Sequence, residues 1–376
     1  MSKQAPERFV NSLQGCLLGS AVGDALGLAC EGLSPRRQTS LFPDLSHYHF
    51  LPGKRGMISD DTEHLCLVAQ ALLRSGGEPR AFQCALAWQL RFWLLGLPAG
   101  IGLATLKGIL KLWLGVSPEH SGVFSAGNGP AMRASLLGVL YATQPEKLKA
   151  LNRISARLTH SDPKAEWGAL AIALAAGFHT LQHPQGEFVS QFRSLLPTPL
   201  PPEAQELLTL LEKAEEQAEQ GREQGLSEQG QQAALQSFIE SLGCKKGITG
   251  YMYHTVPAVL FVWLLQPKDV VAGLQLLIRA GGDTDTTAAL LGAILGAERS
   301  SEIGSAALPP DLLKTLWEWP RSTAWMSETA QKLLPLLESE SPQMPQKLAV
   351  WQLPLRNFIF LFAVLFHGFR RLFPPY

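Results

Sequence analysis

The chain has 376 residues, 46% of them hydrophobic and 17% charged, which is enough apolar material for a substantial core and too little charge for a disordered protein. Its 32 Lys and Arg residues balance its 32 Asp and Glu residues, so no obvious nucleic-acid-binding surface is expected. The five cysteines lack the spacing of a zinc site or a redox pair, and residues 1–10 lack the layout of a signal peptide. We therefore predict a cytoplasmic protein whose cysteines are buried free thiols.

Apolar residues recur at helical spacing along most of the chain, and clear alternating strand patterns are absent. The clearest helical stretches are residues 65–73, 85–95, 136–141, 168–178 and 288–295. Residues 203–240, which are rich in Glu, Gln and Ala and contain three glycines, predict exposed helix broken by turns. The sequence therefore predicts an all-α fold of many helices connected by Gly and Pro turns.

Three parts are expected along the chain: a main domain over residues 1–335, a linker over 336–350 and a hydrophobic C-terminal segment over 351–376. Residues 358–366 are continuously apolar, but this run is shorter than the roughly 20 residues that span a bilayer. Three interpretations stay open for the segment. It is a packed terminal helix, which is favoured, a membrane anchor that gives peripheral contact through residues 353–373, or a segment that docks a partner.

Four glycines near the N-terminus, Gly15, Gly19, Gly23 and Gly27, recur every four residues. On a helix they form one stripe that another backbone can approach closely, and that packing has to offset about 1 kcal/mol per glycine relative to alanine. Glu31 follows at the predicted end of this helix, where a carboxylate faces the negative end of the helix dipole. A cation or a substrate proton is the candidate partner that would hold it there, and an exposed surface glutamate is the alternative.

Two acidic clusters stand more than two hundred residues apart: Ser59-Asp60-Asp61-Thr62, and Asp283-Thr284-Asp285-Thr286 after a pair of glycines. Each opens an apolar helical stretch, and each offers adjacent carboxylates and hydroxyls, the oxygen ligands that Mg²⁺ and Mn²⁺ prefer. Helix capping, including a capping box between Asp60 and Glu63, is the alternative for the first cluster. If the fold brings both clusters together, cations must balance the four aspartates.

The second cluster also matches the DxDxT pattern of phosphatases that form an aspartyl phosphate on the first Asp. That chemistry normally follows a buried strand, whereas the residues before Asp283 predict a helix that ends in glycines. A calcium loop of the EF-hand type fits worse, because Ala288 and Ile294 stand where Gly and Glu are required. A loop that ligates one or two hard cations remains the favoured interpretation.

Two further turns are candidates for substrate contact. Gly127-Asn128-Gly129-Pro130 could hold a phosphate with its amides, with Arg133 one turn inside the next helix. Thr159-His160-Ser161-Asp162-Pro163 is a second turn into a helix, where a single His is more often a packing residue than a catalyst. Tyr251 and Tyr253 could stack on a base, although core aromatics are commoner.

Together these segments resemble the ADP-ribosylglycohydrolase family, which includes the dinitrogenase-reductase-activating glycohydrolases. The similarity runs in the family's order through GCLLGSAVGDALGLACEG, SDDT, GNGPAMR, THSD, GYMYHTVPAVL and GGDTDT, over roughly residues 11–300. It implies a compact all-α fold with a two-metal site in a cleft. By this resemblance, the metal ligands are Ser59, Asp60 and Asp61 from one side and Asp283, Asp285 and Thr286 from the other.

The resemblance also implies roles for other residues. Glu31 would be the catalytic carboxylate, and the substrate would contact Gly127, Asn128, Gly129, His160 and Ser161. We also predict that Asp60 and Asp285 are catalytic and that Tyr251 contacts the substrate. Two Mg²⁺ or Mn²⁺ ions would orient the ribose while Glu31 acts as general base. Which water attacks stays open.

The expected function is metal-dependent hydrolysis of the glycosidic bond between ADP-ribose and an acceptor, which is a protein side chain or a small molecule. A non-catalytic ADP-ribose-binding protein on the same scaffold is the alternative, and the aspartyl phosphatase is less favoured. The sequence leaves the acceptor linkage and the choice between Mg²⁺ and Mn²⁺ open.

Overall fold

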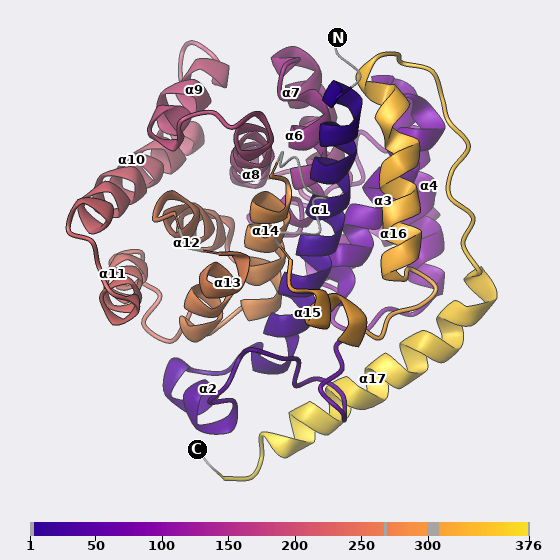
Figure 1. The fold of residues 1–376 in the computed structure, drawn as a ribbon. Helices are drawn as coiled ribbons and strands as arrows, with labels where there is room; N and C mark the ends of the chain where they lie inside the picture. Colours follow the sequence, from indigo (N-terminus) through magenta and orange to yellow (C-terminus); the bar gives the residue numbers. More distant parts are fainter. Residues whose placement is uncertain (1–3, 267–268, 299–307, 375–376) are drawn as a thin grey trace.

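The computed structural model of the chain describes residues 4–266, 269–298 and 308–374, and it confirms the predicted all-α fold (Figure 1). In these residues the only β structure is a set of isolated backbone bridges. The first eight helices are α1 (Gln4–Gly27), α2 (Pro35–Leu41), α3 (Asp60–Ser75), α4 (Pro79–Leu95), α5 (Leu103–Trp113), α6 (Ser135–Tyr141), α7 (Pro145–Arg157) and α8 (Pro163–Leu181). The next nine are α9 (Phe188–Leu195), α10 (Pro202–Glu223), α11 (Glu228–Ser241), α12 (Met252–Leu264), α13 (Val270–Arg279), α14 (Thr284–Gly296), α15 (Pro310–Thr315), α16 (Thr323–Leu333) and α17 (Leu353–Arg370).

The predicted helical stretches all fall within helices, namely α3, α4, α6, α8 and α14. The segment 203–240 forms α10 and α11 with a turn between them, as predicted. All five cysteines are free thiols, and four are buried, but Cys84 is exposed. The prediction of burial is wrong for Cys84 because this residue lies on the solvent side of α4, whose other side packs on α3.

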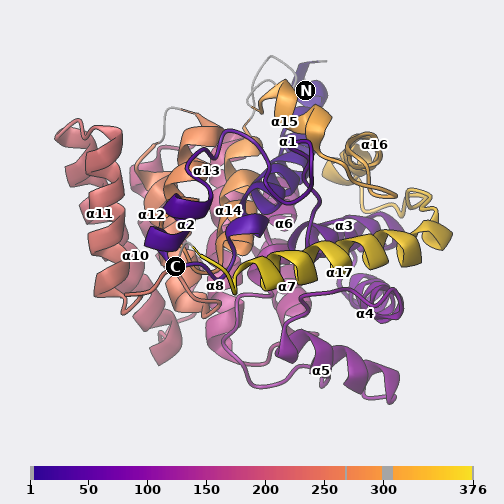
Figure 2. The same ribbon diagram turned by 90° about the horizontal axis from the view of Figure 1, so that it is seen from below.

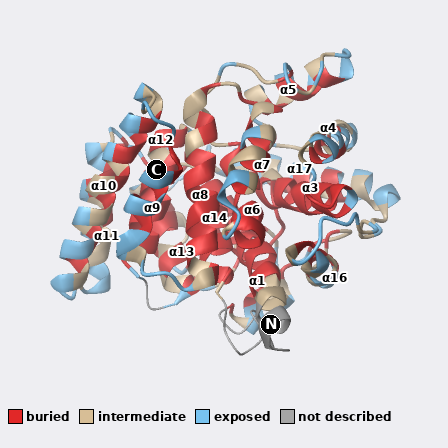
Figure 3. Cartoon of the chain, turned by 90° about the horizontal axis from the view of Figure 1, so that it is seen from above, coloured by how far each residue is buried: buried red, intermediate tan, exposed pale blue. Residues whose placement is uncertain are grey.

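Helices α1 and α14 form the centre of the molecule, with α6, α8 and α12 packed around them (Figures 1 and 3). Every residue of α14 is buried. A helix that is apolar on all sides is stable only where other elements cover every face. The N-terminal end of α14, which carries the second acidic cluster, is therefore fixed by the core.

The packing of α1 on α14 is backbone against backbone, which is what the glycine stripe predicts. A Cβ added at Gly23 would lie 2.0 Å from the carbonyl oxygen of Ala288. The corresponding distances to backbone oxygens of α14 would be 2.1 Å at Gly19 and 2.2 Å at Gly27. The Thr284 hydroxyl donates to the Gly27 carbonyl at 2.8 Å. The end of α1 and the start of α14 are thus held in direct contact.

The C-terminal part of the chain wraps around the outside of this core. Residues 339–349, within the predicted linker, form no regular structure, and α17 then crosses the lower side of the molecule (Figures 1 and 2). One side of α17 packs through Phe360 and Ala363 against a small apolar cluster with Leu28 and Phe50. The segment 353–373 is thus a packed terminal helix on this side, while its other side is exposed.

We expect Gly23→Ala to lower the free energy of unfolding by about 3 kcal/mol, because the new methyl group forces the α1 and α14 backbones apart. Gly368→Ala is the matched control, since Gly368 also lies in a helix and open space surrounds its Cβ position. That variant should be neutral or up to about 1 kcal/mol more stable. Urea unfolding measures both values, and equal stability of the two variants would contradict the close packing.

Candidate active site

A buried carboxylate from α1 holds the turn that opens α3. Asp24 accepts hydrogen bonds from the Ser59 backbone N–H at 2.9 Å and from the Thr62 backbone N–H and hydroxyl at 3.1 and 2.6 Å. Ser59 is the N-cap of α3, because its hydroxyl oxygen accepts from the Asp61 N–H at 3.2 Å. Asp24 therefore positions the loop that carries the first acidic cluster.

Glu63 does not form the predicted capping box with Asp60. Its carboxylate accepts hydrogen bonds from Arg321 at 2.7 Å and from the Trp93 indole N–H at 2.6 Å, and the Arg356 guanidinium lies 3.7 Å away. Burial acts to raise the pKa of Glu63, but the two arginines hold it below its ordinary value. The capping-box alternative does not hold, because charged partners from distant segments bind the carboxylate more strongly than a backbone N–H does.

The second acidic cluster follows a turn that only glycine can make here. Gly281 and Gly282 have φ values of +73° and +88°, and a Cβ at Gly282 would lie 1.9 Å from the Ile248 carbonyl oxygen. The turn connects α13 to α14, so a helix precedes Asp283. In the part of the chain that the structure describes, the buried strand that an aspartyl phosphatase would require is absent.

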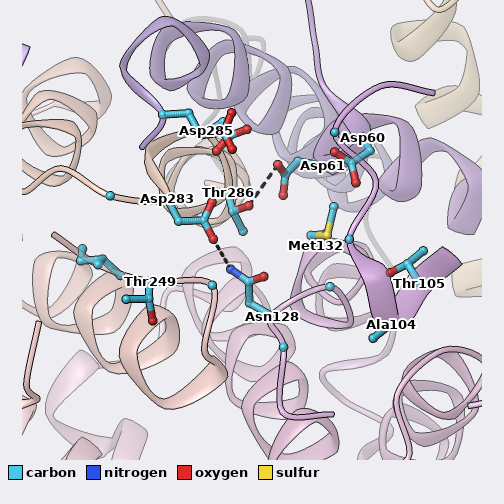
Figure 4. Close-up of a pocket in the computed structure, with 18 of the residues that line it drawn as sticks. Asp60, Asp61, Ala104, Thr105, Asn128, Met132, Thr249, Asp283, Asp285 and Thr286 are labelled. Carbon is cyan, nitrogen blue, oxygen red and sulfur yellow. Dashed lines mark hydrogen bonds between the residues drawn. The ribbon is translucent and has the colours of Figure 1, made fainter. Parts of the chain in front are cut away.

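The two acidic clusters meet at one cavity with a volume of about 620 Å³ (Figure 4). The Thr286 hydroxyl donates to Asp61 Oδ2 at 3.2 Å, which joins the clusters directly. Behind Asp61, the Ser59 hydroxyl donates to the same oxygen at 3.1 Å, and Ser59 itself does not line the cavity. The acidic and hydroxyl side chains of the clusters that do line it are Asp60, Asp61, Asp283, Asp285 and Thr286.

Two carboxylate oxygens at this cavity, Asp61 Oδ1 and Asp285 Oδ1, are buried and have no hydrogen-bond partner among the described residues. Burial, and then repulsion by neighbouring carboxylates, raises the pKa of both side chains well above the usual range. Buried carboxylate oxygens without partners are suitable donors for a hard divalent cation. The described residues contain no group of three acidic, His or Cys side chains already spaced to hold a metal ion. The residues therefore fit a cation by the chemistry of their oxygen donors and not by a preformed ligand geometry.

Glu31 lines the same cavity, just beyond a short 3₁₀ turn that extends α1. Gly32 follows with φ +70°, a left-handed conformation that favours glycine just after the end of a helix. The Glu31 side chain is partly open to solvent, but partial burial and then the charge of Asp283 raise its pKa, and Arg371 opposes the shift. A carboxylate of raised pKa beside an open cavity is suited to exchange protons with a bound substrate or water.

The loop Gly127–Gly129 forms another wall and lies directly on the imidazole of His160, which also lines the cavity. A Cβ at Gly127 would lie 3.1 Å from His160 Nε2, and a Cβ at Gly129 would lie 3.0 Å from His160 Cε1. The Asn128 side-chain amide donates to Asp283 Oδ2 at 2.7 Å (Figure 4). The structure thus brings the predicted glycine loop and His160 to the acidic clusters.

A chain of hydrogen bonds connects Arg133 to the ring of His160. Arg133 Nη2 donates to Thr159 Oγ1 at 2.7 Å, and Thr159 Oγ1 lies 2.9 Å from His160 Nδ1. If the Thr159 hydroxyl donates to Nδ1, the proton of the neutral ring lies on Nε2, beside the glycine loop. Burial, and then the charge of Arg133, lowers the pKa of His160 to about 3, so the ring is neutral at neutral pH.

Arg133 itself is not available to a substrate, so the suggestion that it assists phosphate binding is wrong. Its side chain is fully buried and also contacts His64 Nδ1 at 3.2 Å and the Ser155 carbonyl oxygen at 3.0 Å. Pro130 precedes a 3₁₀ turn rather than the first turn of an α-helix. The guanidinium consequently lies in the core, where it positions the Thr159–His160 pair.

Two predicted substrate-binding residues do not line the cavity. Tyr251 is the N-cap residue of α12, where its hydroxyl accepts a hydrogen bond from Lys164 at 3.0 Å and its ring packs against the core. The Ser161 backbone N–H donates to the Val123 carbonyl at 2.9 Å in the turn before α8. The neighbouring residues Gly250 and His160 line the wall instead.

Sequence analysis missed two stretches of the wall: Gly100 with residues 102–105, and residues 246–249. In the second stretch, Gly247 is a sequence feature that could have indicated a close backbone contact. It has φ +113°, and a Cβ there would lie 2.5 Å from the Gly282 amide nitrogen. It also contributes Lys246, a basic side chain at the cavity. Residues 100–105 are ordinary turn and helix-start residues, and nothing in their pattern indicates a site.

Comparison with known proteins gives consistent results along nearly the whole chain. The sequence profile of the ADP-ribosylglycohydrolase family matches residues 5–343. An uncharacterized protein of Archaeoglobus fulgidus is 30% identical over 337 residues, which are 88% of this chain and 97% of that protein. ADP-ribosylhydrolase ARH3 of Bos taurus is 28% identical over 322 residues, 77% of this chain and 85% of the relative. A solved structure titled ADP-ribosylglycohydrolase-related protein complex has the same fold, with a TM-score of 0.59, 24% identity and coverage of 88% of this chain and 99% of that one.

The helical fold is shared with that solved structure, and the cavity of this chain is lined by carboxylates. The family match over residues 5–343 shows that the chain belongs to the ADP-ribosylglycohydrolase family. It is an enzyme of the hydrolase class that acts on linkages to ADP-ribose.

We expect the His160 ring to remain a neutral Nε2–H tautomer from pH 8 down to pH 5, because its pKa lies near 3. Long-range ¹H–¹⁵N spectra of the histidine rings report the tautomer directly, and His160→Gln assigns the signal. Thr159→Val should change the ¹⁵N shifts of this ring, since Nδ1 loses its donor. Protonation of His160 between pH 5 and pH 8 would contradict the lowered pKa, and an Nδ1–H tautomer would contradict donation from Thr159 to Nδ1.

Proposed function

We propose that this enzyme is a divalent-cation-dependent hydrolase that cleaves the glycosidic bond between ADP-ribose and an acceptor, either a modified protein side chain or a small molecule. The observation that carries the proposal is the meeting of two distant acidic clusters at one cavity, with a buried, unpartnered oxygen on Asp61 and another on Asp285. We infer the ADP-ribose part of the substrate from the family to which the chain belongs. The cavity lining includes glycine-rich backbone, one histidine and carboxylates, which suits a polar sugar nucleotide.

The proposed cation ligands are the residues of the two clusters. Asp60 and Asp61, with Ser59 behind them, would hold ions from the α3 side, and Asp283, Asp285 and Thr286 would hold them from the α14 side. All these donors are oxygens, which favours Mg²⁺ or Mn²⁺ over softer metals. Two bound ions would bind ribose hydroxyls, stabilise developing charge and lower the pKa of a water molecule.

Other residues at the cavity would transfer protons and bind the substrate. Glu31, whose pKa is raised, would accept a proton from the attacking water or donate one to the leaving group. His160 would donate a hydrogen bond from Nε2 to the substrate. The diphosphate would lie against the Gly127–Gly129 loop near Lys246, so that remote binding energy orients the ribose. We place the enzyme in the cytoplasm.

Divalent cations should stabilise the purified protein against heat. At a free concentration about 100 times the dissociation constant, Mn²⁺ or Mg²⁺ should add about 2.7 kcal/mol to the free energy of unfolding. The gain should be larger at pH 8 than at pH 5.5, because Asp61 and Asp285 have raised pKa values and hold protons at low pH that the cation must displace. Differential scanning fluorimetry with and without EDTA measures the effect.

Asp285→Asn should abolish most of this cation-induced rise in Tm, whereas Asp311→Asn, at an exposed helix start, should keep it. A Tm that does not respond to either cation at pH 8 would contradict the metal site.

Catalysis is tested with acceptors ADP-ribosylated on arginine, on serine, on a nucleic-acid end and on a small molecule. With Mg²⁺ or Mn²⁺ the wild type should release ADP-ribose from at least one of them, and EDTA should abolish release. Glu31→Gln should lower kcat by about 10²–10⁴-fold, because it removes the general base, while the affinity for ADP-ribose changes little. Glu146→Gln, at an exposed position on α7, is the control and should have wild-type kcat.

Calorimetry with ADP-ribose separates the remaining possibilities. Tight binding of ADP-ribose without release from any of the four acceptors would identify a binding protein and contradict the proposed hydrolysis. An unchanged kcat in Glu31→Gln would remove Glu31 from the mechanism.

A further inference from the structure

The outward side of α17 is a continuous apolar stripe. Its exposed members recur at helical spacing and are large: Leu355, Phe358, Phe362, Leu365, Phe366 and Phe369. We call this set the outer stripe. Large aromatic side chains that line one exposed side of a helix are rare on a protein surface without a binding role.

The inward side of α17 is held on the protein by polar contacts along its length. Arg356 is buried and donates to both carboxylate oxygens of Glu318, at 3.0 and 2.7 Å. The Asn357 amide donates to the Gly96 carbonyl, and a His367 ring nitrogen lies 2.9 Å from the Phe50 carbonyl oxygen. By length and composition the stretch Val350–Arg370 could cross a membrane, and 28% of it is buried in the protein. These contacts instead keep α17 parallel to the protein surface, because removing Arg356 would leave Glu318 buried without a partner.

The outer stripe ends in a positively charged corner. Arg370 and Arg371 follow it, and α2 adds Arg36 and Arg37, of which Arg37 donates to the Arg371 carbonyl. Residues 341–376 contain no Asp or Glu, although the whole chain has as many acidic as basic residues. Arg371 also reaches the edge of the catalytic cavity, since a Cβ at Gly32 would lie 3.6 Å from its Nη1. Apolar area and positive charge thus lie side by side at one end of α17.

We propose that the outer stripe and the arginine corner bind the surface of a membrane that contains anionic phospholipids. The Phe and Leu side chains would enter the interface while the arginines pair with phosphate groups, which is the arrangement of a helix that lies in the membrane plane. A second copy of the chain is a poorer occupant. A two-fold contact through this patch would place the arginine corners of two copies in one interface, and residues 341–376 supply no acidic partner for them. The proposal is independent of the catalytic chemistry.

Vesicle co-sedimentation of the full chain, loaded with Mn²⁺, tests the proposal. The wild type should bind vesicles of equimolar phosphatidylcholine and phosphatidylglycerol, bind phosphatidylcholine alone much more weakly, and lose affinity as salt is raised. Phe362→Ser/Phe366→Ser should weaken binding about a hundredfold through lost apolar burial. Arg370→Gln should weaken it about fivefold, whereas Arg193→Gln, on α9, should not change it. All variants should keep the wild-type Tm, since the changed side chains are exposed.

Absence of wild-type binding to the anionic vesicles would overturn the proposal, as would equal binding by the double Phe variant. Sedimentation equilibrium without lipid measures whether the outer stripe instead joins two copies of the chain. A wild-type dimer that Phe362→Ser/Phe366→Ser converts to a monomer would assign the outer stripe to a second copy of the chain.

Discussion

The close contact between the backbones of α1 and α14 is the constraint on which the site depends. It brings Gly27 next to Thr284, and so it places the end of one helix beside the start of the other. Asp24, one turn earlier in α1, then pins the turn before α3. Three segments that are far apart in sequence are thereby fixed around one cavity by a single packing arrangement. Larger side chains in the stripe would separate the helices and spread the acidic residues apart.

Four buried carboxylates in the described part of the chain form two contrasting pairs. Glu63 and Glu318 are paired with Arg321 and Arg356, and their charges are balanced within the protein. Asp61 and Asp285 have no basic partner among the described residues, and each has an oxygen without a hydrogen bond. Where the arginine is present, its charge compensates the burial of the carboxylate, whereas a buried carboxylate without a partner destabilises the folded state. The two kinds therefore differ in whether the protein itself supplies the balancing charge.

Features encoded locally could be predicted from the sequence, and features that depend on distant partners could not. Helical periodicity located the core helices, and the spacing of Gly19, Gly23 and Gly27 indicated a close backbone contact before its partner was known. The role of Asp24 was missed because its hydrogen bonds reach a turn 35 residues away. Arg133 was misassigned for the same reason: a basic residue after a glycine loop suggests phosphate binding, and only the fold shows that it is buried. The two acidic clusters were found because each is a compact motif.

The ion pairs of Arg356 connect the last helix to the rest of the folded chain. The family profile stops at residue 343, yet Arg356 lies beyond it and its guanidinium donates to the Ile58 carbonyl, the residue before Ser59. A chain cut after the matched region would bury Glu318 without a counter-charge and uncover the apolar side chains beneath α17. The packed structure therefore extends beyond the region that the family profile matches, and the last helix contacts the backbone next to the first acidic cluster.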